Sequence, residues 1–338
     1  MRHPLTATRL MCLGRRWTIA AIATLFPFNG AYAADDIYRS EADSFLAGLP
    51  EGLQSRQTDA IRQAIAGDTV TLVAVRKSRD AVPELPEGVR RIPAGDNIAL
   101  FRSDKYANDT IPLLVYFHGG GWTIGSINSC SRFCAAMALN GVAVLAVDYR
   151  LAPEHGFPSG LNDCVSAVRT ALDSLKTWKC RGISLGGDSS GGNLAIATAL
   201  SFPAGTFDAL AAFYPVTRAY PDNSKSWEKY GLGYGLDSEL MEAFNDAYTT
   251  DIHNPLVSPM EAPDDALRNL PPTLIVAAER DILRDQGAEF ADRLNLLGIP
   301  VEYHLVPGSV HLFITVPGQP AAFNHSVSST TSFLHRNN

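Results

Sequence analysis

The amino-acid sequence predicts an α/β fold with a mostly parallel central sheet flanked by helices. Short apolar runs without polar alternation follow one another along the chain, and patterns typical of helices separate them. A strand buried on both faces shows such a run, because helices cover both sides of a parallel sheet. Right-handed crossovers then bring the carboxyl ends of the strands to one edge of the sheet, where we expect the functional site.

The expected elements follow from this alternation. Strands are expected at Val89–Ile92, Ile98–Phe101, Leu113–Phe117, Val142–Val147, Ile183–Leu185, Ala209–Tyr214, Thr273–Ala277 and Val301–Val306. Helices are expected at Cys130–Leu139, Leu161–Leu175, Asn193–Leu200 and Gln286–Leu297, and at the C-terminal end. Residues 34–85 are expected to be amphipathic and helical in part.

Residues 217–262 break the alternation and are expected to form an insertion over the active edge of the sheet. The segment is rich in Tyr and Trp and contains the pattern of one amphipathic helix, with Asp237 as its N-cap. The apolar face of that helix carries Leu240, Met241, Phe244 and Tyr248. The alternative is a surface excursion that takes no part in the site.

Composition favours one catalytic domain with insertions. Of the 338 residues, 46% are hydrophobic and 19% charged, and the formal net charge is −7. The sequence contains no repeat and no linker rich in Gly, Ser or Pro, so a division into two domains is not indicated. Because the body of the chain lacks a basic cluster, a nucleic-acid partner is not expected.

The N-terminus has the pattern of an export signal. Four arginines precede the first acidic residue, Asp35, and an apolar run follows at Trp17–Phe28. The run is too short to span a bilayer comfortably, and Ala31-Tyr32-Ala33 supplies the small residues of a cleavage site. We therefore expect residues 1–33 to be a signal peptide cleaved after Ala33. The mature protein would be periplasmic or secreted and without a stable membrane anchor; a retained anchor is the alternative.

Four cysteines remain after this expected processing, namely Cys130, Cys134, Cys164 and Cys180. An even number in an oxidising compartment allows pairing, but Cys130 and Cys134 are four residues apart in an expected helix, where disulfide geometry is awkward. Buried thiols are the equal alternative, and the sequence leaves the two open. No Cys or His spacing indicates a metal site.

A Gly-x-Ser-x-Gly pattern lies at the point where a short apolar strand passes directly into a helix. Gly187 and Gly191 flank Ser189 there, with Asp188 and Ser190 between them. A serine on such a tight turn projects its hydroxyl at the sheet edge, and the glycines relieve crowding that a Cβ atom would cause. The helix N-terminus favours negative charge beside it. The pattern predicts Ser189 as a nucleophile.

A glycine-rich loop follows the strand Leu113–Phe117, as His118-Gly119-Gly120-Gly121-Trp122. Glycines past a strand end expose backbone N–H groups with no side chain in the way. Such donors, together with the N–H of Ser190, suit the oxyanion of a tetrahedral intermediate. A tight strand-to-helix turn without catalytic role is the alternative, and the serine motif in the same chain argues against it.

The base and its orienting acid are sought in the order serine, acid, histidine. Asp281 lies in the loop after the strand Thr273–Ala277, whereas Glu279 is barely past that strand and Asp285 is expected to begin or cap the next helix. Among the later histidines, His304 lies inside a strand and His325 and His335 in or beside the terminal helix. His311 lies in the loop just after a strand and is the expected base.

These motifs together resemble the bacterial hormone-sensitive-lipase-like esterases of the α/β-hydrolase superfamily. The matching segments are HGGGW at 118–122, DYRLAPEH at 148–155, GDSSGG at 187–192, YPV at 214–216, SP at 258–259, ERDILRD at 279–285 and the His311 loop. They cover about residues 89–330 in the family's order. Two positions depart from the family: Ser190 replaces the usual alanine, and the histidine loop reads GSVHLF.

The resemblance implies an α/β-hydrolase fold, with a catalytic domain at 86–216 and 263–338 and a cap built from 34–85 and 217–262. It implies a triad of Ser189, Asp281 and His311, and an oxyanion hole made by the amides of Gly119, Gly120 and Ser190. The residues expected to support these motifs are His118, Gly121, Trp122 and Asp188. Tyr149, Arg150, Glu154 and Asp163 match positions that brace loops behind the site.

The resemblance also implies a carboxylesterase that acts without a cofactor on short- to medium-chain acyl esters, through an acyl-enzyme. A small-molecule ester is therefore the expected partner; a homodimer is compatible with the sequence, which fixes no oligomeric state. An amidase, formamidase or lactonase with the same triad is the nearest alternative. A ligand-binding protein without catalysis on the same fold is a more distant one.

Overall fold

The computed structural model describes residue 1 and residues 29–338, with side chains from residue 36 onward. The expected signal peptide therefore lies almost wholly outside the described residues. Only its end is included, because the first helix, α1, runs over Asn29–Ala47, and cleavage after Ala33 would remove the first residues of that helix. Within the described part of the chain, no helix is both long and apolar enough to cross a membrane.

An eight-stranded sheet forms the centre of the molecule, in the order β1-β2-β4-β3-β5-β6-β7-β8. Its first three strands pair antiparallel, and the pairs from β4 to β8 are parallel. The α/β fold with a mostly parallel sheet is thus confirmed. The strands are β1 Val89–Gly95, β2 Ile98–Ser103, β3 Ile111–Phe117, β4 Ala143–Val147, β5 Cys180–Asp188, β6 Ala209–Phe213, β7 Thr273–Arg280 and β8 Val301–Val310.

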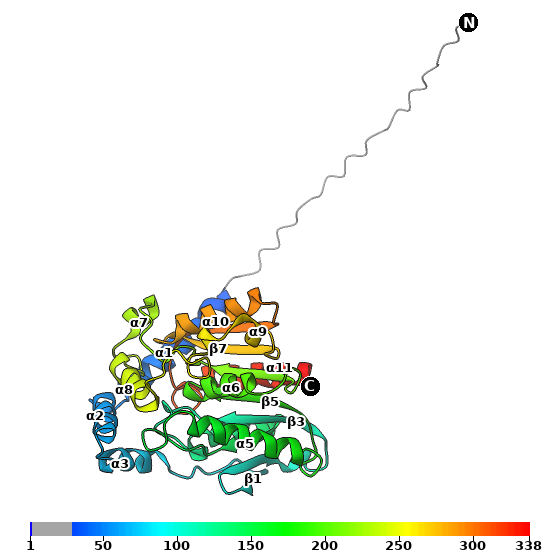
Figure 1. Ribbon diagram of the computed structural model, residues 1–338, viewed down its shortest axis with the longest axis horizontal. Coiled ribbons are helices and arrows are strands. Elements are labelled where there is room, and N and C mark those ends of the chain that lie inside the picture. Colours follow the sequence, from blue (N-terminus) through cyan, green and yellow to red (C-terminus); the bar gives the residue numbers. More distant parts are fainter. Residues whose placement is uncertain (2–28) are drawn as a thin grey trace.

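Helices cover both faces of this sheet (Figure 1). Alternate residues of β3 face opposite ways: Leu113 and Val115 belong to one apolar core, Leu114 and Tyr116 to the other. The first core includes residues of α5 (Ser159–Ser174), α6 (Ser190–Leu200) and α10 (Arg284–Leu296), and the second those of α4 (Ile127–Leu139) and α11 (Pro320–Asn337). This burial on two sides explains why the strands read as unbroken apolar runs.

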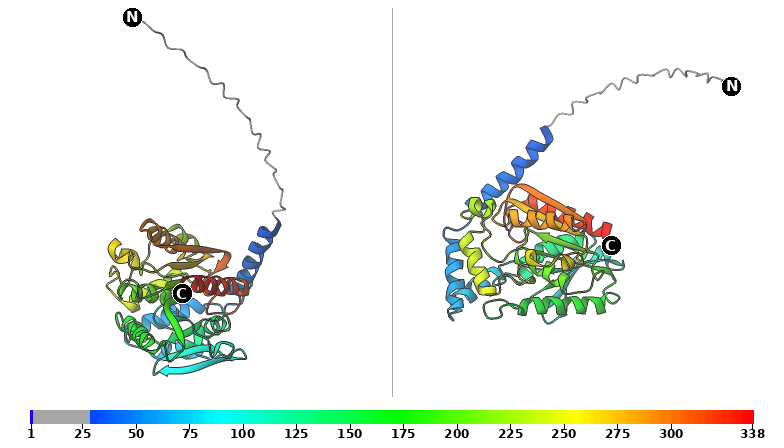
Figure 2. Two further views of the ribbon diagram at one scale, coloured as in Figure 1. Left: turned by 90° about the vertical axis from the view of Figure 1, so that its right-hand side faces the viewer. Right: turned by 45° about the horizontal axis from the view of Figure 1, so that its top comes forward.

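The segments outside this pattern gather on one side of the molecule (Figure 1). They contain α2 (Leu53–Ile65), α3 (Val70–Arg79), α7 (Lys225–Tyr230) and α8 (Ser238–Tyr248), which we call the cap helices; α9 is the short Asp264–Leu267. Helix α2 packs on α8. Figure 2 shows α1 running outward from the body, and its C-terminal half packs on β8 through Ala42, Phe45 and Val310.

Residues 217–262 differ from the expectation in two details. They hold two helices rather than one, since α7 is also formed. Asp237 occupies the N-cap position of α8, but its side chain makes no capping hydrogen bond to that helix. Its carboxylate instead accepts from the N–H of Gly233, at 2.7 Å, and thereby closes the glycine-rich turn that precedes α8.

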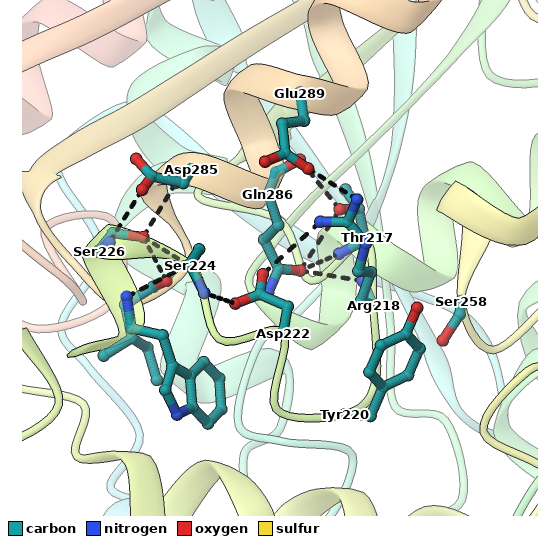
Figure 3. Close-up of polar contacts among 12 residues, drawn as sticks. Thr217, Arg218, Tyr220, Asp222, Ser224, Ser226, Ser258, Asp285, Gln286 and Glu289 are labelled. Atoms are coloured by element: carbon teal, nitrogen blue, oxygen red, sulfur yellow. Dashed lines mark hydrogen bonds and ion pairs between the residues drawn. The ribbon is translucent and has the colours of Figure 1, made fainter.

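A polar network fixes the start of this insertion to α10 (Figure 3). The side-chain oxygen of the buried Gln286 accepts from the N–H of Thr217 at 2.6 Å and from the N–H of Arg218 at 2.9 Å. Arg218 also forms an ion pair with Glu289 at 2.7 Å. Because each backbone donor finds a partner, the chain can leave the sheet here without burying an unsatisfied N–H group.

Candidate active site

Ser189 occupies the turn between β5 and α6, in a strained backbone conformation. Its φ is 54° and its ψ is −120°, a combination that costs a non-glycine residue about 1–3 kcal/mol. Its N–H donates to the carbonyl of Phe213 at 2.9 Å, and its own carbonyl accepts from Asn193 at 3.1 Å. These bonds to β6 and α6 hold the side chain at the carboxyl edge of the sheet.

The two glycines of the motif are required by close approach of backbone atoms. A Cβ atom on Gly187 would lie 2.2 Å from the carbonyl oxygen of Gly191, and one on Gly191 would lie 2.1 Å from that of Phe117. Real Cβ atoms do not come so close to oxygen, and a backbone oxygen cannot move aside as a side chain can. No residue larger than glycine fits either position without shifting a strand end or the start of α6.

A hydrogen-bonded chain joins the three residues expected to form the triad. Nε2 of His311 lies 3.1 Å from Oγ of Ser189, and Nδ1 of His311 lies 2.6 Å from Oδ2 of Asp281. The other oxygen of Asp281 accepts from the N–H of Leu283 at 3.0 Å. His311 and Asp281 are buried at 2% and 1% exposure, so water does not compete for these bonds. Asp281 directly follows β7 and His311 directly follows β8.

The other candidate acids have different partners. Glu279 lies within β7, and its carboxylate accepts from the N–H of Gly308 at 2.5 Å. Asp285 lies in the first turn of α10, and its carboxylate accepts from the N–H of Ser226 at 2.8 Å (Figure 3). The hydroxyl of Ser226 donates to the carbonyl of Ile282. The loop that carries Asp281 is therefore tied to the cap helix α7.

The other candidate histidines lie away from Ser189. His304 is in β8, and its Nδ1 is 3.3 Å from Nε2 of His325, which is in α11. Burial lowers the pKa of His325, and the neighbouring His304 adds to that shift. His335, also in α11, has its Nε2 3.3 Å from the carbonyl of Asn140. Of the four, His311 is the one placed beside the serine.

The glycine loop corrects one expectation about the oxyanion hole. The N–H of Gly119 donates to Oδ1 of Asp188 at 3.0 Å, so this donor is already hydrogen-bonded. The amides of Gly120, Gly121 and Ser190 donate to no acceptor within the residues that the structure describes. Gly120 and Gly121 both line the cavity that contains Ser189. Gly121, expected only to support the motif, thus has an amide without an acceptor among the described residues, whereas the amide of Gly119 is hydrogen-bonded.

Asp188 explains why this loop adopts its shape. Its carboxylate is 1% exposed and accepts from the hydroxyl of Tyr116 at 2.8 Å as well as from Gly119. Burial raises the pKa of Asp188 to about 6, although both hydrogen bonds oppose the shift. One carboxylate, next to the nucleophile in sequence, thereby fixes the glycine loop against the serine turn.

Aromatic stacking holds the two ends of the glycine loop. The His118 ring stacks on Tyr149 at 4.3 Å, and the Tyr149 hydroxyl donates to the His118 carbonyl at 2.7 Å. Burial lowers the pKa of His118, which keeps its ring neutral near pH 7. Trp122 has a positive φ of 57° and stacks on Tyr248 of α8 at 4.3 Å. Both residues shape the loop and neither reaches Ser189.

Three of the four residues expected to brace loops, Arg150, Glu154 and Asp163, form ion pairs. Arg150 contacts Asp163 at 2.9 Å, and Glu154 contacts Arg76 of α3 at 2.7 Å. The Arg76 guanidinium also donates to the carbonyl of Thr123, which follows the glycine loop. The sequence carried no signal for this contact, because 47 residues separate its partners. Helix α3 is thereby attached to the site.

A cavity of about 250 Å³ opens beside Ser189, between the glycine loop and the cap helices. Most of its wall is apolar and comes from both cap segments. The lining residues are Leu49, Pro50, Leu53, Gln54, Gln57, Arg79, Gly120, Gly121, Ile124, Ser189, Gly235, Leu236, Leu240, Phe244, His311, Leu312 and Val316. The arrangement can admit a small apolar ligand and place it against a hydroxyl, an imidazole and three backbone N–H donors.

The remaining metal-ligating and redox side chains are dispersed. Within the described part of the chain, no three His, Cys, Asp or Glu side chains come together as a metal site would need. Cys130, Cys134, Cys164 and Cys180 are buried free thiols, with 3.8 Å between the sulfurs of Cys130 and Cys134. Burial raises the pKa of Cys164 and Cys180, so these two thiols are poor nucleophiles.

Comparisons with known proteins agree with this fold. A family model described as alpha/beta hydrolase fold matches residues 114–315. An arylesterase of Saccharolobus solfataricus is 38% identical over 61% of this chain and 69% of its own length. Lipase 2 of Moraxella sp. (strain TA144) is 31% identical over 94% of this chain and 73% of its own. A putative alpha/beta hydrolase of Acanthamoeba polyphaga mimivirus is 34% identical over 62% of this chain. The chain spans only 63% of the length of that relative.

A solved structure extends the similarity to the whole fold. A thermostable esterase from Pseudomonas putida ECU1011 superposes with a TM-score of 0.75 at 26% identity, covering 88% of this chain and 97% of that one. The family match includes the strands that precede Ser189, Asp281 and His311. The chain therefore belongs to the α/β-hydrolase fold family, in its hormone-sensitive-lipase-like branch.

Proposed function

We propose that the protein is a carboxylesterase in which Ser189, His311 and Asp281 act as a catalytic triad. The observation that carries the proposal is the buried chain of hydrogen bonds from Asp281 through His311 to Ser189, which ends in a cavity. The strained φ of Ser189 supports it, since strain of this kind persists where function requires a projected side chain. The esterase and lipase names of relatives support ester cleavage.

The proposed reaction proceeds through an acyl-enzyme. Oγ of Ser189 attacks the ester carbonyl while Nε2 of His311 accepts its proton, and His311 then gives that proton to the departing alcohol. Water repeats the sequence, adding its oxygen to the acyl carbon and releasing the carboxylic acid. Asp281 accepts from Nδ1–H of His311 throughout, which fixes the tautomer and stabilises the imidazolium.

The negative oxygen that forms in each step needs donors that are already oriented. We assign them to the amides of Gly120, Gly121 and Ser190, whose N–H groups have no acceptor within the described residues. The N-terminus of α6, where the helix dipole is positive, also lies next to Ser189 and favours the negative oxygen. Fixed donors of this kind stabilise the transition state without the reorganisation that water would need. The side chain of Ser190 is not required, because only its N–H takes part.

The size of the cavity supports short- to medium-chain acyl groups. Its volume of about 250 Å³ is closed on the cap side by Leu240 and Phe244 of α8. Each methylene that finds apolar wall contributes about 0.8 kcal/mol, so activity should rise with chain length and fall once the space is filled. Amide or lactone hydrolysis by the same triad is the second candidate, and no feature of the cavity favours it over ester cleavage.

The test is hydrolysis of p-nitrophenyl acetate, butyrate and octanoate by the purified protein and by Ser189→Ala. We expect the wild type to cleave them and Ser189→Ala to be inactive but folded, judged by circular dichroism. Ser201→Ala, at the other end of α6, is the matched control and should be active. Retention of activity by Ser189→Ala would refute the triad, and a wild type inactive on every ester would refute the proposed function.

We also propose that the protein is exported, with cleavage after Ala33. The support is the arginine-rich start, the apolar run and the Ala-Tyr-Ala site. N-terminal sequencing of protein from the periplasm or medium should begin at Ala34. Recovery of the full-length chain from the cytosol alone would contradict this proposal.

A further inference from the structure

The cavity beside Ser189 has one polar wall, formed by α2 and α3. Gln54 and Gln57 lie one turn apart on α2, and Arg79 is the last residue of α3. Every other side chain of the lining is apolar, apart from Ser189 and His311. Among the described residues, Arg79 is the one Lys, Arg, Asp or Glu residue that lines this cavity. A fixed positive charge stands within a space otherwise suited to hydrocarbon.

The side chain of Gln57 makes no hydrogen bond within the described residues, although the residue is only 5% exposed. Gln54, by contrast, accepts from the N–H of Asp237 at 2.6 Å. A polar amide in a mostly apolar cavity can form a hydrogen bond with a ligand that enters it. Because Gln57 lines the cavity, a bound molecule is the partner within reach.

Arg79 lacks a counterion as well. No carboxylate lies within 4 Å of its guanidinium in the described part of the chain, although burial lowers the pKa of Arg79. The adjacent Asp80 is taken, since its carboxylate accepts from Asn128 at 2.8 Å and from Ser126. Arg76, one turn earlier on the same helix, is by contrast paired with Glu154. The charge at position 79 is left for an anion from outside.

A second cavity, of about 500 Å³, continues from this wall. It shares Arg79 and Val316 with the first and is also lined by Arg132 and Glu84. Nε of Arg132 is buried without a hydrogen-bond partner in the described residues. Counted over the described residues, the two cavities together carry two guanidinium groups and one carboxylate. The whole chain, by contrast, has a formal net charge of −7. The local excess of positive charge favours an anionic ligand.

We propose that Arg79, assisted by Gln57, binds a carboxylate group of the substrate, so that the preferred substrates are esters bearing a free carboxylate, such as monoesters of dicarboxylic acids. A guanidinium matches a carboxylate through paired hydrogen bonds, and the Gln57 amide can donate another. The inference rests on the proposed function for turnover: water adds across the ester bond, giving an alcohol and, for a monoester, a dicarboxylic acid. Arg79 and Gln57 act as specificity residues and take no part in the bond-breaking step.

The test compares matched charged and neutral esters. In the acyl series, p-nitrophenyl monoglutarate is set against p-nitrophenyl hexanoate; in the alcohol series, 4-acetoxybutanoate is set against pentyl acetate. We expect the charged member to have the higher kcat/KM in at least one series, and that series identifies the side of the ester that carries the carboxylate. Arg79→Gln should lower the charged-to-neutral ratio about tenfold to hundredfold, Gln57→Leu should lower it less, and Arg79→Lys should retain part of it.

Lys77→Gln is the matched control, because it removes one positive charge from the exposed side of the same helix. Its charged-to-neutral ratio should equal that of the wild type. Equal ratios in the wild type, Arg79→Gln and Lys77→Gln would overturn the proposal, as would a wild-type preference for the neutral ester in both series.

A binding measurement separates this proposal from the proposed function. The Ser189→Ala variant is titrated by calorimetry with monomethyl glutarate and, separately, with dimethyl glutarate. This measurement of binding requires no turnover. We expect tighter binding of the monoester and loss of that preference in the Ser189→Ala, Arg79→Gln double variant. If the protein binds the monoester more tightly but hydrolyses no ester, only the proposed carboxylesterase function is refuted. If it hydrolyses esters but shows no preference for the monoester, only the proposed carboxylate site is refuted. Should Arg79→Gln fail to fold, Gln57→Leu and Arg79→Lys carry the same comparison.

Discussion

The serine turn at the carboxyl edge of the sheet is held by backbone contacts, whereas the cap helices meet the cavity through side chains. At the edge, Gly187 and Gly191 admit no Cβ atom, and the N–H and carbonyl of Ser189 are both bonded to neighbouring backbone. In the cap, Leu240 and Phe244 of α8 supply apolar bulk to the cavity wall. Positions of the first kind tolerate almost no substitution, while positions of the second kind can change the size and character of the cavity and leave the reacting groups in place.

The largest expected effect lies at the edge. His311→Ala should lower kcat on the order of 10⁶-fold, which is the loss seen when another serine hydrolase lacks its catalytic base. The loss of kcat in Asp281→Asn should be smaller by about one to two orders of magnitude. Combining either with Ser189→Ala should add little. The measurement is steady-state hydrolysis of p-nitrophenyl butyrate. A wild-type rate in Asp281→Asn with an inactive Glu279→Gln or Asp285→Asn would show that the acid has been misassigned.

The second effect tests how the cap is joined to the edge. Gln286→Leu removes the acceptor of two backbone N–H groups, those of Thr217 and Arg218, and should lower the free energy of unfolding by about 2–4 kcal/mol. Glu289→Gln, which breaks only the exposed ion pair with Arg218, should cost about 0–1 kcal/mol. Urea unfolding of the two variants measures both. Equal losses would mean that the buried amide is not what anchors the insertion (Figure 3).

A third effect concerns Asp188, which joins the serine turn to the glycine loop. Its pKa is raised to about 6 in the folded chain, above the usual value of an unfolded aspartate, so the native state binds more protons between about pH 4 and 6. Stability from this group is therefore present at low pH and is lost as the pH rises through that window. Between about pH 4 and 6, the free energy of unfolding of the wild type should fall with rising pH by on the order of 2–3 kcal/mol more than that of Asp188→Asn. Parallel curves would contradict the raised pKa.

The smallest expected effect lies in the cap. Phe244→Ala should move the optimum of the p-nitrophenyl ester series to longer chains, because it enlarges the acyl space beside Gly121. Each additional methylene accommodated should change kcat/KM about fourfold, which corresponds to roughly 0.8 kcal/mol. Ile65→Ala removes apolar bulk from an exposed position of α2 that does not line the cavity, and should leave the optimum unchanged. If Phe244→Ala has the same dependence of kcat/KM on chain length as the wild type, the cap does not select the acyl chain length.

The reacting residues could be predicted from the sequence because each lies at a fixed offset from a strand end. Ser189 has glycines two residues away on both sides, and Asp281 and His311 directly follow β7 and β8. Strand β5 extends from Cys180 to Asp188, beyond the expected Ile183–Leu185. Gly186 and Gly187 carry no apolar side chain to indicate a strand, yet they pair with β3 and β6.

The remaining features depend on contacts between distant segments. Gly119 and Gly121 are alike in sequence, and only the position of the Asp188 carboxylate decides which amide is occupied. The anchor at Gln286 joins residues nearly 70 positions apart, and no local pattern predicts such a partner. Asp237 precedes α8 as a capping residue should, but Gly233 provides a nearer donor. Local sequence propensity predicts where the helices and strands lie. Hydrogen bonds between distant segments determine the conformation and the partners of the loops that connect them.

The most direct test of the account is covalent labelling of the nucleophile. The purified protein is treated with a fluorophosphonate ester, and the adduct is located by intact mass and peptide mapping. We expect one adduct, on Ser189, formed in step with the loss of hydrolysis of p-nitrophenyl butyrate, and a much slower reaction in His311→Ala because its serine lacks the base. An adduct on another residue, or full activity after Ser189 is labelled, would contradict the assignment of Ser189 as the nucleophile.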